Sequence, residues 1–167
     1  MYFMLKENDR IPAGLQGILV TSDDAKNSGP GKTVKLSELD KDKYLILYFY
    51  PKDMTPGCTI ETSSFGELDS DIRKAGGTIV GCSRDNVSSH CKFISNQKIS
   101  FSLLTDDTEQ ITAAFGVWQK KKMYGKEYMG IHRSTFITHK GKIIKVFDKV
   151  KPAEHPAEVL AFLKTLP

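Results

Sequence analysis

Residues 44–59 read YLILYFYPKDMTPGCT, a run of apolar and aromatic residues followed by a Pro/Gly turn and a cysteine. An unbroken apolar run such as 44–50 is typical of a strand buried on both faces of a sheet. Pro51 ends that strand. The sequence then predicts a helix over about 57–75, with Phe65, Leu68 and Ile72 on one face and a Gly-Gly pair at its end. Cys58 therefore opens a helix that follows a buried strand.

The same alternation continues on both sides of this segment. We predict a turn over 22–32 between two early strands, further strands at 78–82 and 101–104, and a helix between these two that is capped by Asp85. A helix at 109–115, a hairpin of strands 133–138 and 142–147, and a last helix at 156–166 follow. Strands alternating with helices indicate an α/β protein, with a central mixed sheet flanked by helices on both faces. That is the layout of a thioredoxin-like fold.

Length and composition indicate one ordinary globular domain. We expect a single domain over residues 1–167, since 40% of the chain is hydrophobic and no apolar run approaches the ~18 residues of a membrane span. The opening residues do not read as a signal peptide, and three cysteines without a Cys-x-x-Cys pair argue against a disulfide scaffold. We therefore expect a cytoplasmic protein with no membrane partner.

The basic residues do not point to nucleic acid. The net charge is +4, and its densest run is residues 120–122, three lysines with Lys126 nearby. Without a nucleic-acid motif beside it, a short lysine run is read as a solvated surface. The four histidines, at positions 90, 132, 139 and 155, show no metal-ligand spacing, and most of them are expected to face solvent, so we expect no metal and no organic cofactor.

Cys58 and Cys82 differ in their sequence surroundings. The free amides of a first helical turn carry partial positive charge, which stabilises a thiolate placed there. Cys58 occupies such a position, among polar residues and prolines, and is the candidate nucleophile. Cys82 ends an apolar run and is expected to be an inert core residue.

Several motifs carry a family resemblance. The pattern Pro51-x-x-x-Thr55-x-x-Cys58 is similar to the active-site signature of the peroxiredoxins. Residues 48–53 (YFYPKD), 116–125 and 128–136 (YMGIHRSTF) resemble the branch called peroxiredoxin Q or bacterioferritin comigratory protein. The resemblance implies a thioredoxin-like fold and a thiol peroxidase. Such an enzyme reduces hydrogen peroxide and organic hydroperoxides through a thiolate/sulfenic acid cycle, with thioredoxin or another thiol as reductant.

The resemblance also assigns roles to individual residues. Cys58 matches the peroxidatic cysteine, which becomes a sulfenic acid. Thr55 would supply a hydroxyl to peroxide and thiol, and Pro51 would shield the pocket from water. Amides near Gly57 would donate to the substrate. The family pattern places Arg133 against the reactive sulfur, where its guanidinium favours thiolate and binds a peroxide oxygen.

The second cysteine of the cycle is where the chain departs from the pattern. Many members carry a resolving cysteine five residues after the first, and that position is Ser63 here. Other members place it on the next helix, where Cys91 lies about one turn before the usual position, occupied by Ile94. Cys91 is the candidate resolving cysteine. Its spacing with Val87 and Ile94 fits core packing equally well, in which case an external thiol such as glutathione resolves Cys58.

Other classes of function stay open to different degrees. A redox sensor that changes partners when Cys58 is oxidised would share the cysteine but would lack turnover. A dithiol oxidoreductase would need a Cys-x-x-Cys pair, which Thr55 and Glu61 rule out, and nothing near Cys58 in sequence supports a Cys-His hydrolase. We expect a monomer, since no obvious edge strand or heptad argues for assembly.

Overall fold

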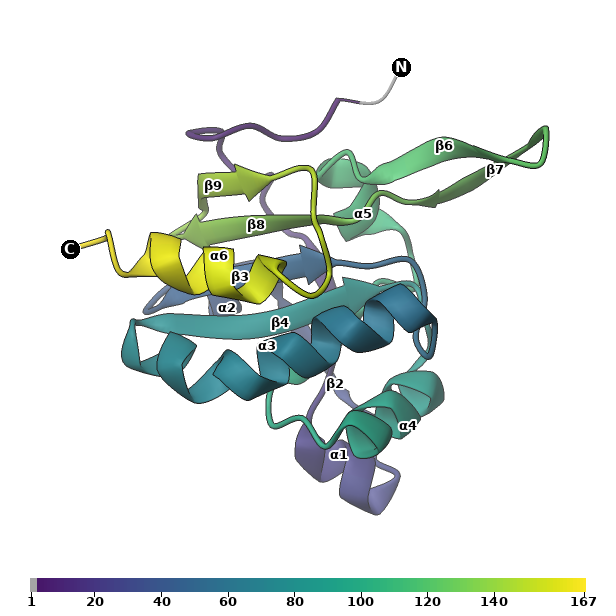
Figure 1. The fold of residues 1–167 in the computed structure, drawn as a ribbon, viewed down its shortest axis with the longest axis horizontal. Coiled ribbons are helices and arrows are strands. Elements are labelled where there is room, and N and C mark those ends of the chain that lie inside the picture. The colour runs from purple at the N-terminus through teal and green to yellow at the C-terminus, as the bar shows by residue number, and fades with distance from the viewer. Residues whose placement is uncertain (1–2) are drawn as a thin grey trace.

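The computed structural model describes residues 3–167, which form a seven-stranded mixed sheet with helices on both sides (Figure 1). The strands are β1 (Gln16–Val20), β2 (Lys32–Lys35), β3 (Tyr44–Phe49), β4 (Gly77–Ser83), β5 (Ser102–Thr105), β6 (Trp118–Met123), β7 (Lys126–Ile131), β8 (Ser134–His139) and β9 (Lys142–Phe147). The helices are α1 (Ser22–Asn27), α2 (Leu36–Leu39), α3 (Pro56–Lys74), α4 (Val87–Gln97), α5 (Gln110–Ala114) and α6 (His155–Leu163).

The sheet order is β2-β1-β5-β4-β3-β8-β9, with β3, β4 and β5 parallel and the other pairs antiparallel. Strand β3 lies inside this sheet, and its side chains alternate between two cores. Ile46 and Tyr48 enter the core under α3, α4 and α6, whereas Leu45, Leu47 and Phe49 enter the opposite core. The continuous apolar run is thus explained by burial on both faces.

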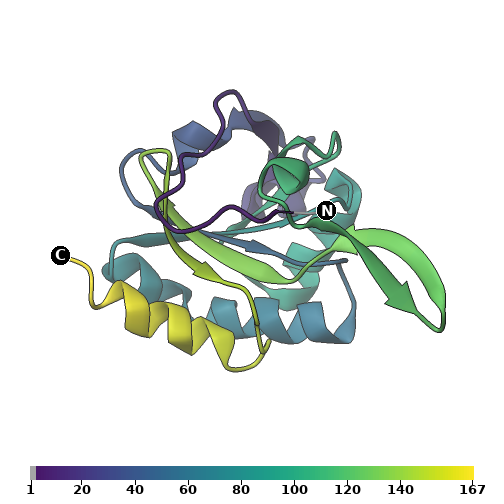
Figure 2. The same cartoon turned by 90° about the horizontal axis from the view of Figure 1, so that it is seen from above.

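Two layers of helix cover the sheet, as the sequence predicted. Figure 2 shows α3 and α6 side by side beneath it, while α2 and the N-terminal segment lie on the other side. Phe65 and Ile72 of α3 pack with Val159 and Leu163 of α6 in the first core. The prediction of a thioredoxin-like mixed sheet flanked on both faces is confirmed.

Most predicted elements are present with ends within three residues of the predicted ones, and two predictions were wrong. Residues 22–27 form α1 instead of a turn, because Thr21 and Asp24 make reciprocal hydrogen bonds that cap a helix: Asp24 N donates to Thr21 Oγ1 at 3.2 Å and Thr21 N to the Asp24 carboxylate at 2.9 Å. The cap of α4 is Asn86, whose side chain accepts from Ser89 N at 2.8 Å, and not Asp85.

The sequence analysis missed the hairpin of β6 and β7. These strands pair with each other, in a sheet of their own, and project beyond the edge of the main sheet in both views (Figures 1 and 2). The lysine run lies on β6, where Lys120 forms an ion pair with Glu127 at 3.2 Å.

Across residues 3–167, no helix is long and apolar enough to span a bilayer.

Candidate active site

Cys58 lies in the first turn of α3, directly after the loop that leaves β3. We call residues 50–55 the Cys58 loop. Thr55 is the N-cap and Pro56 the first helical residue, a position where a missing N–H costs nothing. The first intrahelical hydrogen bond runs from Thr59 N to Thr55 O at 2.9 Å, so the amides of Gly57 and Cys58 lie ahead of it. The helix start therefore offers donors to an anion at Cys58.

Arg133 contacts the sulfur. Its Nη2 donates to Cys58 Sγ at 3.2 Å, and its Nη1 donates to Glu61 Oε1 at 2.7 Å. Arg133 follows β7 and precedes β8, so it lies just outside the strand that the sequence predicted for it. The Arg133 cation thus lies between the buried Glu61 carboxylate and the Cys58 sulfur. Arg133 and Cys58 are 75 positions apart in the chain.

The ionisation of this group of three follows from burial and charge. Burial raises the pKa of Glu61 to about 7, although the Arg133 guanidinium opposes the shift. Burial acts against the Arg133 charge, but the Glu61 carboxylate and the Cys58 sulfur raise the pKa of Arg133 above its usual value. Arg133 therefore stays a cation beside the sulfur.

Gly57 leaves room for this arginine. A Cβ placed on Gly57 would lie 3.1 Å from Arg133 Nη2, closer than side chains normally pack. Thr55 is half-buried one turn before Cys58, and its hydroxyl donates to Lys52 O at 2.9 Å. Pro51 is exposed at the start of the loop. The structure brings Cys58, Gly57 and Arg133 into contact, with Thr55 close by in the chain.

The other two cysteines occupy different surroundings. Cys82 is fully buried in the core of the opposite face, as predicted, and burial together with Asp106 raises the pKa of its thiol. Cys91 is half-buried on α4, beside a cavity of about 400 Å³ that is also lined by Ala25 and Gly29 from the region of α1. Burial and Asp24 raise its pKa.

Two residues near the sulfur were not foreseen. Glu61 had one signal in the sequence, since it is a charged residue four positions before Phe65 on the apolar face of α3. Lys121 is half-buried and donates to Ile131 O, and burial with Arg133 lowers its pKa while Cys58 opposes that shift. The interpretation of the lysine run as solvated surface fits the exposed Lys120 and Lys122 but is wrong for Lys121.

The expectation that most of the histidines face solvent was wrong, since His90 and His155 are both buried. His155 Nε2 lies 2.7 Å from Thr135 Oγ1, and burial lowers the pKa of His155 to about 4. His90 Nδ1 lies 2.8 Å from Asp53. Asp53, Asp85 and His90 bring possible metal ligands within 4.8 Å of one another, a cluster that sequence spacing did not reveal. Each of the three already makes hydrogen bonds to protein groups.

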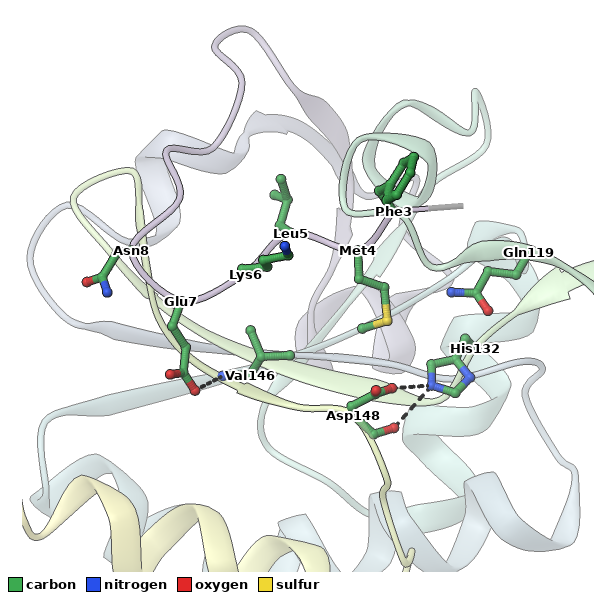
Figure 3. Close-up of a pocket in the computed structure, with 10 residues that line it drawn as sticks. All are labelled: Phe3, Met4, Leu5, Lys6, Glu7, Asn8, Gln119, His132, Val146 and Asp148. Carbon is green, nitrogen blue, oxygen red and sulfur yellow. Dashed lines mark hydrogen bonds and ion pairs between the residues drawn. The ribbon is translucent and has the colours of Figure 1, made fainter. Parts of the chain in front are cut away.

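A cavity of about 850 Å³ lies beneath the N-terminal segment (Figure 3). Met4, Gln119 and Val146 line it, together with His132, whose Nε2 lies 2.6 Å from Asp148 Oδ1. Its lining residues do not include Cys58 or Arg133. The contact between Arg133 and Cys58 at the start of α3 therefore lies outside this cavity.

Comparison with known proteins agrees with this geometry. The AhpC/TSA family model matches residues 20–147. Peroxiredoxin Bcp of Bacillus subtilis is 48% identical over 137 residues, which cover 81% of this chain and 87% of that protein. A solved structure of Xanthomonas campestris peroxiredoxin Q has a TM-score of 0.82 at 39% identity, covering 97% of each chain.

A second solved structure is relevant to chemistry. It concerns alkyl peroxide reduction by the bacterioferritin comigratory protein of Xanthomonas campestris, described from trapped intermediate/ligand complexes. Its TM-score is 0.82 at 38% identity, and the match covers 98% of each chain. The chain therefore belongs to the AhpC/TSA family and, within it, to the Bcp peroxiredoxins, which makes it a thiol-dependent peroxidase.

Proposed function

We propose that Cys58 is the peroxidatic cysteine and that its thiolate attacks the terminal oxygen of a hydroperoxide. A sulfur–oxygen bond forms while the O–O bond breaks, leaving a sulfenic acid on Cys58. The departing hydroxide or alkoxide takes up one proton and leaves as water or alcohol. The observation that carries this proposal is the 3.2 Å contact between Arg133 Nη2 and Cys58 Sγ.

The groups around the sulfur match the charge that develops in this step. Arg133 and the amides of Gly57 and Cys58 are positioned to donate to the oxygens of the peroxide as negative charge moves to the leaving one. Glu61 holds Arg133 in place from the other side. We assign Thr55 to the same pocket as a hydroxyl partner of the substrate and Pro51 to its rim.

We further propose that the substrates include organic hydroperoxides as well as hydrogen peroxide. Two apolar side chains flank the helix start and are exposed, Met54 at 45% and Ile60 at 48%. Apolar surface beside a reactive group favours an alkyl chain over a small polar molecule. The Xanthomonas relative studied for alkyl peroxide reduction supports the same class of substrate.

Regeneration requires a second thiol. We propose that Cys91, 33 residues after Cys58, attacks the sulfenic acid, so that a disulfide forms and water leaves. A thioredoxin-like dithiol then reduces this disulfide and becomes oxidised itself. We place this single-domain enzyme in a reducing compartment such as the cytoplasm, as a monomer without metal or organic cofactor.

The test follows peroxide consumption under a thioredoxin system for wild type, Cys58→Ser, Cys91→Ser and the matched control Cys82→Ser. We expect Cys58→Ser to lose turnover and Cys82→Ser to keep it. Full activity of Cys58→Ser would overturn the proposal. A single equivalent of peroxide consumed without turnover would indicate a sensor instead.

Mass spectrometry of the peroxide-treated enzyme decides how Cys58 is resolved. A Cys58–Cys91 disulfide, together with loss of thioredoxin-driven turnover in Cys91→Ser, would establish the two-cysteine cycle. Normal turnover of Cys91→Ser without such a disulfide would make Cys91 a packing residue and assign resolution to an external thiol.

A further inference from the structure

The segment that links β9 to α6, residues 148–154, lies against the start of α3. We call it the β9–α6 segment. A Cβ placed on Gly57 would have three nearest neighbouring atoms: Arg133 Nη2 at 3.1 Å, Arg133 Cζ at 3.7 Å and Pro152 Cγ at 3.9 Å. Arg133 and Pro152 therefore border the same small volume beside Gly57. A guanidinium and an apolar ring thus lie next to the residue that precedes Cys58.

The first end of the β9–α6 segment is fixed beside Arg133. Nε2 of His132, the residue before Arg133, lies 2.6 Å from Asp148 Oδ1 and 3.1 Å from Asp148 O (Figure 3). His132 N in turn donates to Val117 O at 2.7 Å. The end of β9 is therefore tied to the backbone that carries Arg133.

The second end is fixed on the other side of Arg133. His155, the first residue of α6, is buried, and its Nε2 lies 2.7 Å from Oγ1 of Thr135, two residues after Arg133. The imidazole also makes edge contacts with Phe65 of α3 and Phe147 of β9, with ring centroids 5.7 and 5.1 Å apart. The segment is thus held at both ends by residues that flank Arg133 in the chain.

The middle of the segment is restrained as well. The amides of Glu154 and His155 both donate to Lys151 O, at 3.1 and 2.9 Å, which closes a turn around Pro152. The pyrrolidine ring fixes φ at Pro152, and the residue is half-buried. An apolar group that is already held in place can contact a ligand without a further loss of conformational entropy.

The place of Pro152 bears on the part of the substrate that does not react. In the proposed reaction, the leaving oxygen accepts hydrogen bonds from Arg133 and the Gly57 amide. In hydrogen peroxide this oxygen carries a hydrogen, whereas in an alkyl hydroperoxide it carries the first carbon of the organic group. That carbon needs apolar surface beside Gly57 and Arg133, and the Pro152 ring supplies it.

We propose that Pro152 is a specificity-determining residue whose ring contacts the organic group of a bound alkyl hydroperoxide, and that the β9–α6 segment is the wall of the substrate site that carries this ring. The inference rests on the proposed role of Cys58. A branched or aromatic hydroperoxide, such as cumene hydroperoxide, gains more from this contact than hydrogen peroxide does. Pro152 does not touch the reacting oxygens.

Four variants test this assignment. Pro152→Ala removes the Cγ and Cδ atoms of the ring, and Pro152→Val restores apolar bulk without closing a ring. Ala153→Gly is the matched control, because Ala153 is exposed and the change loosens the same turn without altering the ring. Asp148→Ala detaches the first end of the segment from His132.

Two readouts are measured on each variant. The first is the ratio of kcat/KM for cumene hydroperoxide to kcat/KM for hydrogen peroxide, in which a general loss of activity cancels. The second is the affinity for cumyl alcohol, the product of cumene hydroperoxide, followed by NMR at the Gly57 amide, which requires no turnover. If Cys58→Ser proves fully active, the proposed function fails, while the second readout still decides whether Pro152 contacts an organic group.

We expect Pro152→Ala to lower the ratio about fivefold and to weaken cumyl alcohol binding by a similar factor, roughly the effect of losing one buried methylene contact. Pro152→Val should restore most of both values, and Ala153→Gly should keep those of wild type. Asp148→Ala should lower the ratio less than Pro152→Ala does, because the segment is still held through His155.

Three results would overturn the proposal. The first is a wild-type ratio and a wild-type affinity for cumyl alcohol in Pro152→Ala. The second is an equal loss in Ala153→Gly, because flexibility of the turn would then explain the effect. The third is a lower rate for both hydroperoxides with an unchanged ratio in Asp148→Ala, because the segment would then act only on the position of Arg133. Should Asp148→Ala fail to fold, the variants of Pro152 and Ala153 decide.

Discussion

Cys58 and Cys82 have the same exposure, 0%, yet they lie in cores on opposite faces of the sheet and have different electrostatic surroundings. Each has a buried acidic neighbour, Glu61 for Cys58 and Asp106 for Cys82. At Cys58 the Arg133 guanidinium lies between the carboxylate and the sulfur. At Cys82 the carboxylate acts with burial to raise the thiol pKa, so the thiolate is disfavoured.

On the proposed assignment of Cys58 as the peroxidatic cysteine, burial alone does not distinguish it from Cys82. What separates them is a cation within hydrogen-bonding distance and a helix start beneath the sulfur. The Cys58 thiolate has an Arg133 donor and the free amides of α3, whereas Cys82 lies within β4 among apolar side chains. Each prediction below removes or alters one part of this difference.

Removing the Arg133 guanidinium should have the largest effect on the rate of peroxide reduction. We expect Arg133→Met to lower the second-order rate of peroxide reduction roughly 100- to 1,000-fold, the cost of losing one donor aimed at developing negative charge. The rate for Arg133→Lys should lie between those of wild type and Arg133→Met, since an ammonium group retains the positive charge but not the planar set of N–H donors. Stopped-flow peroxide kinetics measure this.

The matched control for that prediction is Arg84→Met, two residues after Cys82. Arg84 pairs with Glu109 at 3.0 Å and stacks on Trp118, away from Cys58. A rate close to wild type is expected for this variant. A comparable loss in both variants would mean that overall positive charge, and not the guanidinium at the sulfur, drives the reaction.

Glu61, the acidic neighbour of Cys58, should make the unfolding free energy depend on pH. Burial raises the pKa of Glu61 from 4.5 to about 7, so the folded protein binds the Glu61 proton more tightly than the unfolded chain. The favourable contribution is complete below pH 4.5 and is lost as pH rises through 7. At 1.36 kcal/mol per pKa unit, this loss is about 3 kcal/mol.

Glu61→Gln isolates that contribution because glutamine can still accept from Arg133. We expect the unfolding free energy of Glu61→Gln, relative to wild type, to increase with pH between 4.5 and 7 and to level off above. Denaturant unfolding at a series of pH values measures the difference. A difference that does not vary with pH would show that Glu61 titrates alike in the folded and unfolded states.

The strand–helix unit and the position of Cys58 at the start of a helix were predictable from local sequence. The apolar run 44–50, stopped by Pro51, is typical of a strand buried on both faces of a sheet, and a cysteine after a Pro-Gly pair at a helix start is a local pattern. Arg133, remote in the chain, was predicted from the family motif alone, and the structure places it against the sulfur.

The parts that sequence analysis missed depend on contacts between distant residues. The hydrogen bond between Asp53 and His90 joins residues 37 positions apart, and no local sequence pattern predicts it. The β6–β7 hairpin has few buried side chains, so its strands lack the apolar alternation that marks a half-buried strand. Residues 22–32 were predicted as a turn because residues 27–31 (NSGPG) are turn formers. None of residues 22–27 is buried, so their helix depends on the cap formed by Thr21 and Asp24.

A smaller change tests how closely Arg133 must approach. We expect Gly57→Ala to lower the peroxide rate about tenfold, because its Cβ would lie 3.1 Å from Nη2 and push the guanidinium by a few tenths of an ångström. Gly66→Ala is the control, since its Cβ would meet Ile99 Cγ2 at the same 3.1 Å, on the same helix but far from the sulfur. Equal rates for the two variants would show that the pocket tolerates the displacement.

The smallest effect should come from the other cysteine. Cys82→Ala removes a buried sulfur from the core of the opposite face, where it packs among side chains such as Leu104 and Phe49. We expect wild-type turnover and an unfolding free energy lower by about 1 kcal/mol, a typical cost for a small core truncation. Urea unfolding measures the change in unfolding free energy, and the peroxide assay measures turnover. If turnover fell while the unfolding free energy stayed the same, Cys82 would take part in the redox cycle. The two buried cysteines would then not differ in chemical role as we expect.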